Sequence, residues 1–183
     1  MKDKTEENWL NRLEIILGDE TSEHAYFLRE AYLYGSEKSK DRSTKNGAVL
    51  VNDKMGIVSY GTCGLLPQIK DIPERHERPN KYNYLTHAER DVIFNAAKKG
   101  IPTEGLTMYC PWFACADCGI AIISAGIKKI IGHKEIMDNS PLYWMEKIKP
   151  SFEMFEEAGV EVILFSGKIG GVKTLYNENV WEP

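Results

Sequence analysis

The sequence lacks any long apolar run. No stretch approaches the roughly 18 consecutive apolar residues that a membrane-spanning helix needs, so we expect no transmembrane segment. Residues 1–20 mix acidic, amide and apolar side chains, without the basic stretch and apolar core that mark a secretory signal peptide. We therefore expect a cytoplasmic protein.

An excess of basic charge is also missing. The chain has 23 Lys and Arg residues against 27 Asp and Glu residues, for a net charge of -4. Proteins that bind nucleic acid usually carry a basic face, so this balance argues against nucleic acid as a partner. The sequence has no internal repeat or low-complexity linker, and its 183 residues fit a single domain. We expect the core to span about 22–166, with 167–183 as a tail.

Cysteine is scarce, and its four positions are informative: Cys63, Cys110, Cys115 and Cys118. In a reducing compartment cysteines rarely form disulfides. The C-x-x-C pair of Cys115 and Cys118 therefore indicates metal binding or redox chemistry. A second C-x-x-C motif is absent, which argues against a structural zinc knuckle.

The periodicity of apolar residues predicts alternating helices and strands. Helical patterns cover 22–40, 87–99, 115–125 and part of 141–158, and strand patterns cover 47–52, 57–62, 106–110, 127–132 and 160–165. An opening hairpin followed by β-α-β crossovers predicts an α/β fold, a three-layer α/β/α sandwich around a mixed five-stranded sheet. The polar stretch 65–86 is unusually long for a loop, and loops of this length are often functional.

His87 completes a set of three potential zinc ligands with the cysteine pair. Three ligands leave tetrahedral zinc one open position, which suits a water molecule whose pKa the metal lowers to about 7. Glu89 follows two residues after His87 and is better placed as a proton shuttle than as a fourth ligand. All four residues fall in the first turns of two predicted helices, where the helix dipole favours thiolates.

Each of these pieces has a simpler interpretation when taken alone. Thr86 and Glu89 fit a helix capping box. The cysteine pair could be a redox pair, and Cys110 could add a third thiolate that closes the zinc site. Together, at the starts of two successive helices, the pieces favour a catalytic zinc centre with Glu89 as the proton shuttle.

The H-x-E and C-x-x-C motifs are typical of zinc deaminases of nucleobases. The chain resembles the cytidine/deoxycytidylate deaminase family, and most closely its deoxycytidylate (dCMP) deaminase branch, from about residue 31 to 162. The resemblance implies the deaminase sandwich, a catalytic zinc, a homo-oligomer and, in some members, a deoxynucleoside triphosphate effector. The stretches that carry it are Ser43–Val49, Ile57–Gly61, Pro73–Pro79, His87–Arg90, Thr107–Tyr109, the cysteine pair and Ala125–Lys129.

Three residues depart from the family pattern. Ala114 stands where the family usually has a proline before the first ligand cysteine. Cys63 stands where the family usually has an asparagine that commonly contacts the sugar, and a thiol is a weak hydrogen-bonding group. Asn46 replaces a common valine, and its amide could take over a substrate contact or simply shape a turn. These positions bear on which nucleotide is bound.

The stretch 65–86 leads directly into His87 and carries Arg75, Arg78 and Lys81. These cations could bind a 5′-phosphate. A deaminase that acts on free nucleosides would not need them. Acidic residues are interleaved with them, so the loop could instead be a solvated or subunit-contact surface. Trp112 could stack on the base, whereas Phe113 could either line the same pocket or pack in the interior.

These observations predict a zinc-dependent hydrolase that acts on a nucleotide, converting dCMP to dUMP and ammonia. One alternative is a deaminase of another nucleotide or base, of guanine or adenine type. Another is a non-catalytic regulator that binds zinc or nucleotide, against which the presence of Glu89 argues.

Overall fold

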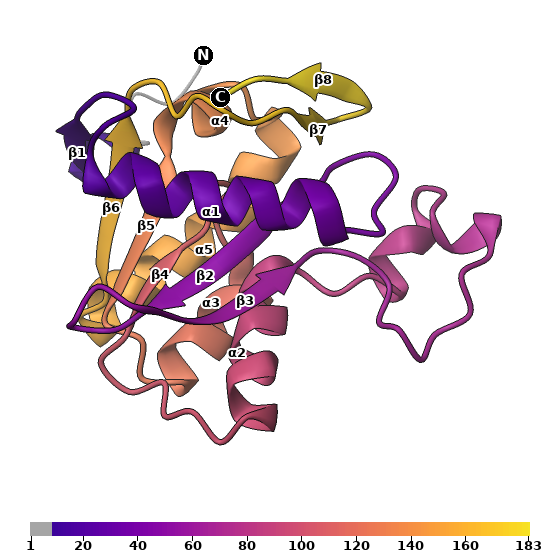
Figure 1. Cartoon of the computed structure of the whole chain (residues 1–183), viewed down its shortest axis with the longest axis horizontal. Helices are drawn as coiled ribbons and strands as arrows, with labels where there is room; N and C mark the ends of the chain where they lie inside the picture. Colours follow the sequence, from indigo (N-terminus) through magenta and orange to yellow (C-terminus); the bar gives the residue numbers. More distant parts are fainter. Residues whose placement is uncertain (1–8) are drawn as a thin grey trace, which may run out of the picture.

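A computed structural model describes residues 9–183 and places a six-stranded mixed sheet at the centre of the protein (Figure 1). The strands, in the spatial order β1-β6-β5-β4-β2-β3, are β1 (Glu14–Leu17), β6 (Glu161–Ser166), β5 (Lys129–His133), β4 (Thr107–Tyr109), β2 (Gly47–Val51) and β3 (Ile57–Thr62). β2 pairs antiparallel with β3 and β4, whereas β4, β5, β6 and β1 are parallel. The predicted mixed sheet is confirmed.

Helices cover both faces of this sheet, which confirms the three-layer sandwich (Figure 1). One face is covered by α1 (Glu23–Lys38), and the other by α2 (Ala88–Lys98), α3 (Ala116–Ser124) and α5 (Leu142–Ala158). Strand side chains alternate between the two faces, so Ile131 packs with the α1 cluster while Ile130 packs with the opposite one. No helix within residues 9–183 is long and apolar enough to cross a membrane.

The start of β2 lies unusually close to α1. A Cβ atom on Gly47 would collide with the carbonyl oxygen of Ala31, so only glycine fits at this position. Because β2 runs antiparallel to β4, the first residue of β2 lies beside the C-terminal end of β4. This arrangement places Asn46 beside Cys110, at the edge where the predicted ligands gather.

The structure differs from the sequence-based expectation in three places. The sheet has six strands rather than five, because β1 adds to its edge, parallel to β6. A short helix, α4 (Lys134–Asp138), follows β5. The tail contains a hairpin of β7 (Thr174–Tyr176) and β8 (Asn179–Trp181), where we expected no regular structure. β1 pairs with β6 and the hairpin packs on residues 43–45, so both involve distant parts of the chain that no local pattern connects.

The C-terminal hairpin packs on the segment that precedes β2. The amide of Lys45 donates to the carbonyl of Leu175 at 2.9 Å, and the amide of Glu178 donates to the carbonyl of Ser43 at 2.7 Å. The hydroxyl of Thr174 donates to the carbonyl of Lys45 at 3.0 Å. The last part of the chain therefore supports the loop before β2.

Candidate active site

His87, Cys115 and Cys118 meet at the starts of two helices. His87 is the N-cap of α2, Cys115 is the N-cap of α3, and Cys118 lies in the first turn of α3. The Nδ1 atom of His87 lies 3.5 Å from the Sγ atom of Cys115 and 3.4 Å from that of Cys118. All three potential ligand atoms lie within 4.8 Å of one another. The structure thus brings together the three ligands expected from the sequence.

These separations fit zinc. Tetrahedral zinc, with sulfur at about 2.3 Å and nitrogen at about 2.0 Å, keeps neighbouring sulfur and nitrogen ligands about 3.5 Å apart. Cys110 does not belong to this group, because its thiol donates instead to the carbonyl of Trp112 at 3.3 Å. Among residues 9–183 the group therefore has three members, the number that leaves zinc an open position.

The protonation of the two cysteines is strongly coupled. The hydrogen bond from Cys118 and the contact with His87 lower the pKa of Cys115 to about 3, even though burial opposes this shift. The same hydrogen bond, together with burial, raises the pKa of Cys118. Zinc binds thiolates, so the thiolate of Cys115 is prepared for the metal, and binding would release the proton that remains on Cys118.

Glu89 lies in the first turn of α2 and is only 2% exposed. Burial raises the pKa of its carboxyl group to about 7, and the nearby charge of His87 opposes this shift. The N-cap of α2 is His87, with no side-chain capping hydrogen bond, and the hydroxyl of Thr86 donates to the carbonyl of His87. The capping-box interpretation of Thr86 and Glu89 is therefore wrong.

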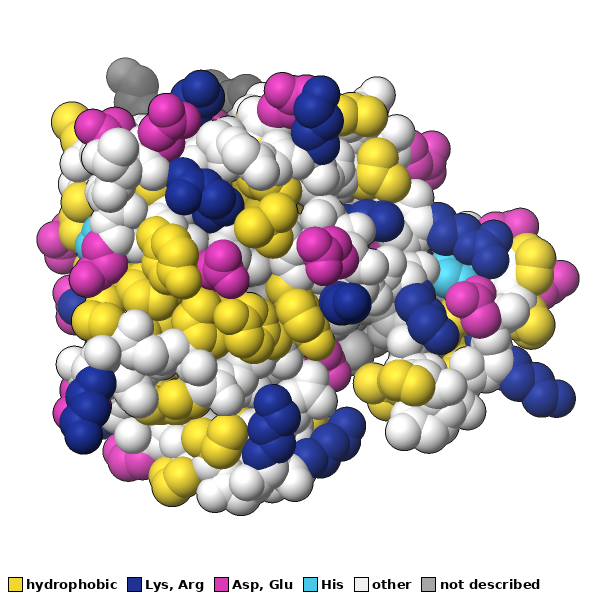
Figure 2. All heavy atoms as spheres, viewed as in Figure 1, with side chains coloured by type: hydrophobic (Ala, Val, Ile, Leu, Met, Phe, Trp, Pro, Cys, Tyr) yellow, Lys and Arg dark blue, Asp and Glu magenta, His cyan; other side chains and the backbone are white. Residues whose placement is uncertain are grey.

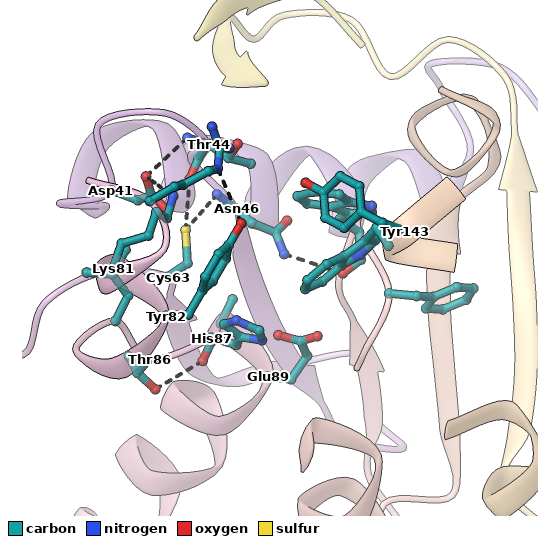
Figure 3. Close-up of a pocket in the computed structure, with 16 residues that line it drawn as sticks. Asp41, Thr44, Asn46, Cys63, Lys81, Tyr82, Thr86, His87, Glu89 and Tyr143 are labelled. Carbon is teal, nitrogen blue, oxygen red and sulfur yellow. Dashed lines mark hydrogen bonds and ion pairs between the residues drawn. The ribbon is translucent and has the colours of Figure 1, made fainter. Parts of the chain in front are cut away.

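A cavity opens beside Glu89 and His87 (Figure 3). The space between its walls, counted together with its open mouth, is about 650 Å³. Its walls come from segments that are far apart in sequence: the loop before β2, the end of β3, the stretch 78–89, the residues after β4 and the start of α5. Such an enclosed space next to a buried carboxyl group is suited to holding a small substrate.

Lys81 lines this cavity, but its charge is already paired. Its Nζ atom lies 2.8 Å from Oδ2 of Asp41 and 2.7 Å from the hydroxyl of Ser43. Burial alone would raise the pKa of Asp41, but the hydrogen bond and charge of Lys81 lower it. Lys81 thus fastens the stretch 65–86 to the loop before β2, and does not present the free cation that we expected.

Arg78 and Arg75 occupy different environments. Arg78 lines the cavity, and its guanidinium contacts the hydroxyl of Tyr82 and the side-chain oxygen of Asn177, each at 3.2 Å. Its side chain is 41% exposed. Arg75 lies outside the cavity wall, over the ring of Tyr84. Of the three predicted cations, Arg78 is the one that both lines the cavity and has an accessible charge.

The thiol of Cys63 is tied into the wall of the cavity. It accepts a hydrogen bond from the amide of Asn46 at 3.2 Å and donates to the carbonyl of Thr44 at 3.0 Å. Burial raises its pKa to about 12, so it stays protonated. Cys63 therefore contributes to the shape of the wall rather than offering a hydrogen bond to a ligand.

Of the residues just before the cysteine pair, some line the cavity and others lie in the core. Trp112 lines the cavity, and its indole nitrogen donates to the hydroxyl of Ser140 at 2.7 Å. Phe113 reaches the cavity but packs against Phe152, with ring centroids 5.3 Å apart. Ala114 is fully buried in the core and is not part of the cavity wall.

Several aromatic residues of the wall were not predicted from the sequence. Trp144 lies 5.0 Å from Trp112 and 5.9 Å from His87, measured between ring centroids. Tyr82 and Tyr143 also line the cavity, whereas Tyr176 from the tail hairpin packs on Trp112 from outside it. Two adjacent aromatic residues, Tyr143 and Trp144, at the start of a predicted helix could have suggested a binding surface. No local pattern, however, indicated that Trp144 lies beside His87.

The sequence of this chain is similar to those of known proteins. A family model described as the cytidine and deoxycytidylate deaminase zinc-binding region matches residues 21–134. This range contains the three potential zinc ligands and Glu89. An uncharacterized deaminase from Aliivibrio fischeri is 38% identical over 136 residues, covering 74% of this chain and 88% of that protein. The deoxycytidylate deaminase of Mus musculus is 34% identical over 149 residues, covering 78% and 79%.

Solved structures share the fold. The dCMP deaminase of cyanophage S-TIM5, determined in complex with dCMP and dUMP, superimposes with a TM-score of 0.58 at 22% identity. The match covers 75% of this chain and 92% of that one. The matched sequence region, the relatives and the three potential zinc ligands all point to the same family. This chain belongs to the cytidine and deoxycytidylate deaminase family.

Proposed function

We propose that this protein hydrolyses dCMP to dUMP and ammonia. The observation that carries the proposal is the position of Glu89, whose buried carboxyl group lines the cavity directly beside the three potential zinc ligands. The relatives named deoxycytidylate deaminase support the choice of nucleotide. A regulator that only bound zinc or nucleotide would have no need of a buried carboxyl group at this point, since burying such a group is costly.

The chain supplies the groups that this hydrolysis requires. His87, Cys115 and Cys118 would hold zinc, which provides Lewis-acid activation of water. Glu89 would accept a proton from the water and deliver protons to the ring nitrogen and the departing amine. A carbon–oxygen bond forms at the carbon that bears the amine, the carbon–nitrogen bond breaks, and ammonia leaves.

The cavity wall accounts for binding of the rest of the nucleotide. The ring of Trp112, held by its hydrogen bond to Ser140, gives the base a flat apolar surface beside Trp144. Arg78 lies at the accessible rim, where its guanidinium could pair with the 5′-phosphate. The contact with phosphate favours a nucleotide over a free base or nucleoside.

We further infer that the protein acts as a homo-oligomer in the cytoplasm. Figure 2 shows hydrophobic side chains gathered in a band over α1 and β3, and Tyr26 on α1 is 49% exposed. β3 is an edge strand of the sheet, and exposed apolar surface at such an edge is suited to contact with another copy. A deoxynucleoside triphosphate effector stays a prediction from the family resemblance.

The oligomer is tested by the mass of the purified full-length chain in solution. We expect light scattering after size exclusion to give a multiple of the 20.8 kDa chain mass. A mass of one chain at micromolar concentration would contradict the inference.

Ammonia release from a panel of substrates tests the proposed function. The zinc-loaded protein should deaminate dCMP and prefer it to deoxycytidine, CMP, dCTP, dGMP, GMP, dAMP and guanine. Preferential turnover of a purine, or of none of these compounds, would refute the proposal.

Replacing Glu89 with glutamine tests its role as the proton shuttle. We expect Glu89→Gln to lower kcat by about 10²- to 10⁴-fold, because the amide cannot accept and return the proton. Zinc content and the affinity for dUMP should stay close to those of the wild type. Glu153→Gln, at an exposed position of α5, is the matched control and should keep full activity. Turnover that persisted in Glu89→Gln would mean that another group moves the proton.

A pair of arginine variants tests the phosphate contact. Arg78→Gln should lower kcat/KM for dCMP by about 10- to 100-fold, the range expected for losing a charge-assisted hydrogen bond. Activity on deoxycytidine, which has no phosphate, should change little. Arg75→Gln makes the same chemical change outside the cavity wall and should stay within about twofold of the wild type. Equal losses in both variants would argue against a specific role for Arg78.

A further inference from the structure

Asn46 carries a buried amide oxygen without a partner in the described part of the chain. The residue is 8% exposed and lines the cavity. Its Nδ2 atom donates to the carbonyl of Trp112 and contacts the Sγ atom of Cys110, each at 3.4 Å. Its Oδ1 atom has no hydrogen-bond partner among residues 9–183. Buried polar atoms are normally paired, so an acceptor left open in this position calls for an explanation.

The orientation of this amide is set by its neighbours. The carbonyl of Trp112 can only accept a hydrogen bond, so the amide nitrogen of Asn46 must face it. Turning the amide over would bring two acceptor oxygens together. Figure 3 shows the side chain of Asn46 between Cys63 and Tyr143, above His87 and Glu89. The open acceptor therefore belongs to the wall that a bound substrate would face.

The other polar groups on this side of the cavity are paired with one another. Lys81 is bound to Asp41 and Ser43. The hydroxyl of Thr44 accepts from the amide of Asn177, and its carbonyl accepts from the thiol of Cys63. Asn46 thus offers an acceptor that no neighbouring group uses. A ligand that donates a hydrogen bond at this point would satisfy it.

We propose that Oδ1 of Asn46 accepts a hydrogen bond from the bound nucleotide, which makes Asn46 a specificity-determining residue. The choice of nucleotide rests on the proposed function. dCMP has two kinds of donor, its exocyclic amine and its 3′-hydroxyl, and the same acceptor could bind either one. The product dUMP keeps the hydroxyl, has a carbonyl in place of the amine and gains a hydrogen on the ring nitrogen N3. Probes that contain one donor or neither can therefore distinguish the two.

The test uses Asn46→Leu, which keeps the approximate side-chain size and removes the polar atoms. We expect kcat/KM for dCMP to fall about tenfold or more, because the donor on the substrate loses its acceptor. 2′,3′-Dideoxyuridine monophosphate lacks the amine and the 3′-hydroxyl and shares only the ring N3–H with dUMP. Its affinity should stay within about twofold of the wild type, since neither of the two donors of dCMP is present to be lost. Weaker binding of dUMP would assign the contact to the hydroxyl, and unchanged binding of dUMP would assign it to the amine.

Two results would overturn the proposal. One is unchanged kcat/KM for dCMP, as expected if the oxygen only binds water. The other is equal loss of affinity for dUMP and for the dideoxy probe, which would show that neither the amine nor the 3′-hydroxyl is the partner of Asn46. Zinc content and thermal unfolding identify a misfolded variant, in which case Asn46→Ala provides the same comparison.

Asn95→Leu, in α2 and outside the cavity wall, is the matched control and should not change the preference among these nucleotides. The affinities for dUMP and the dideoxy probe are measured without turnover. A failure of the wild type to deaminate dCMP would therefore count against the proposed function. The binding comparison would still test the contact made by Asn46.

Discussion

The active site depends on the convergence of two helix N-termini at one edge of the sheet. His87 and Cys115 are the N-caps of α2 and α3, and the first turn of each helix adds one further functional residue, Glu89 or Cys118. Helix N-termini favour negative charge, so the same geometry that gathers the ligands also favours the thiolate form of Cys115. The packing of α2 and α3 on the sheet therefore fixes both the composition and the charge of the site.

The cavity depends on contacts between distant parts of the chain. The ion pair of Lys81 and Asp41 ties the stretch 65–86 to the loop before β2. The C-terminal hairpin braces that loop, and its turn residue Asn177 contacts Arg78 at the rim. This hairpin lies beyond residues 21–134, the range that the family model matches. Tyr143 and Trp144, which line the cavity, also lie beyond that range, so part of the wall comes from outside the matched region.

Local patterns predicted the elements that carry the chemistry. The apolar periodicity gave 87–99 for a helix that spans Ala88–Lys98, and the motif spacing identified the three ligand residues. What the sequence could not show was tertiary pairing. The pairing of Lys81 with Asp41, the approach of Trp144 to His87 and the addition of β1 at the sheet edge join residues that no local pattern connects.

The chemistry of this protein requires an open zinc site built from one histidine and two cysteines. X-ray absorption spectroscopy of the zinc-loaded full chain can show whether that site forms, because it reports the type and distance of the atoms around the metal. We expect two sulfur ligands at about 2.3 Å, one imidazole nitrogen at about 2.0 Å and one further light atom from solvent. A third sulfur, which would bring in Cys110 and close the site, would rule out this zinc site.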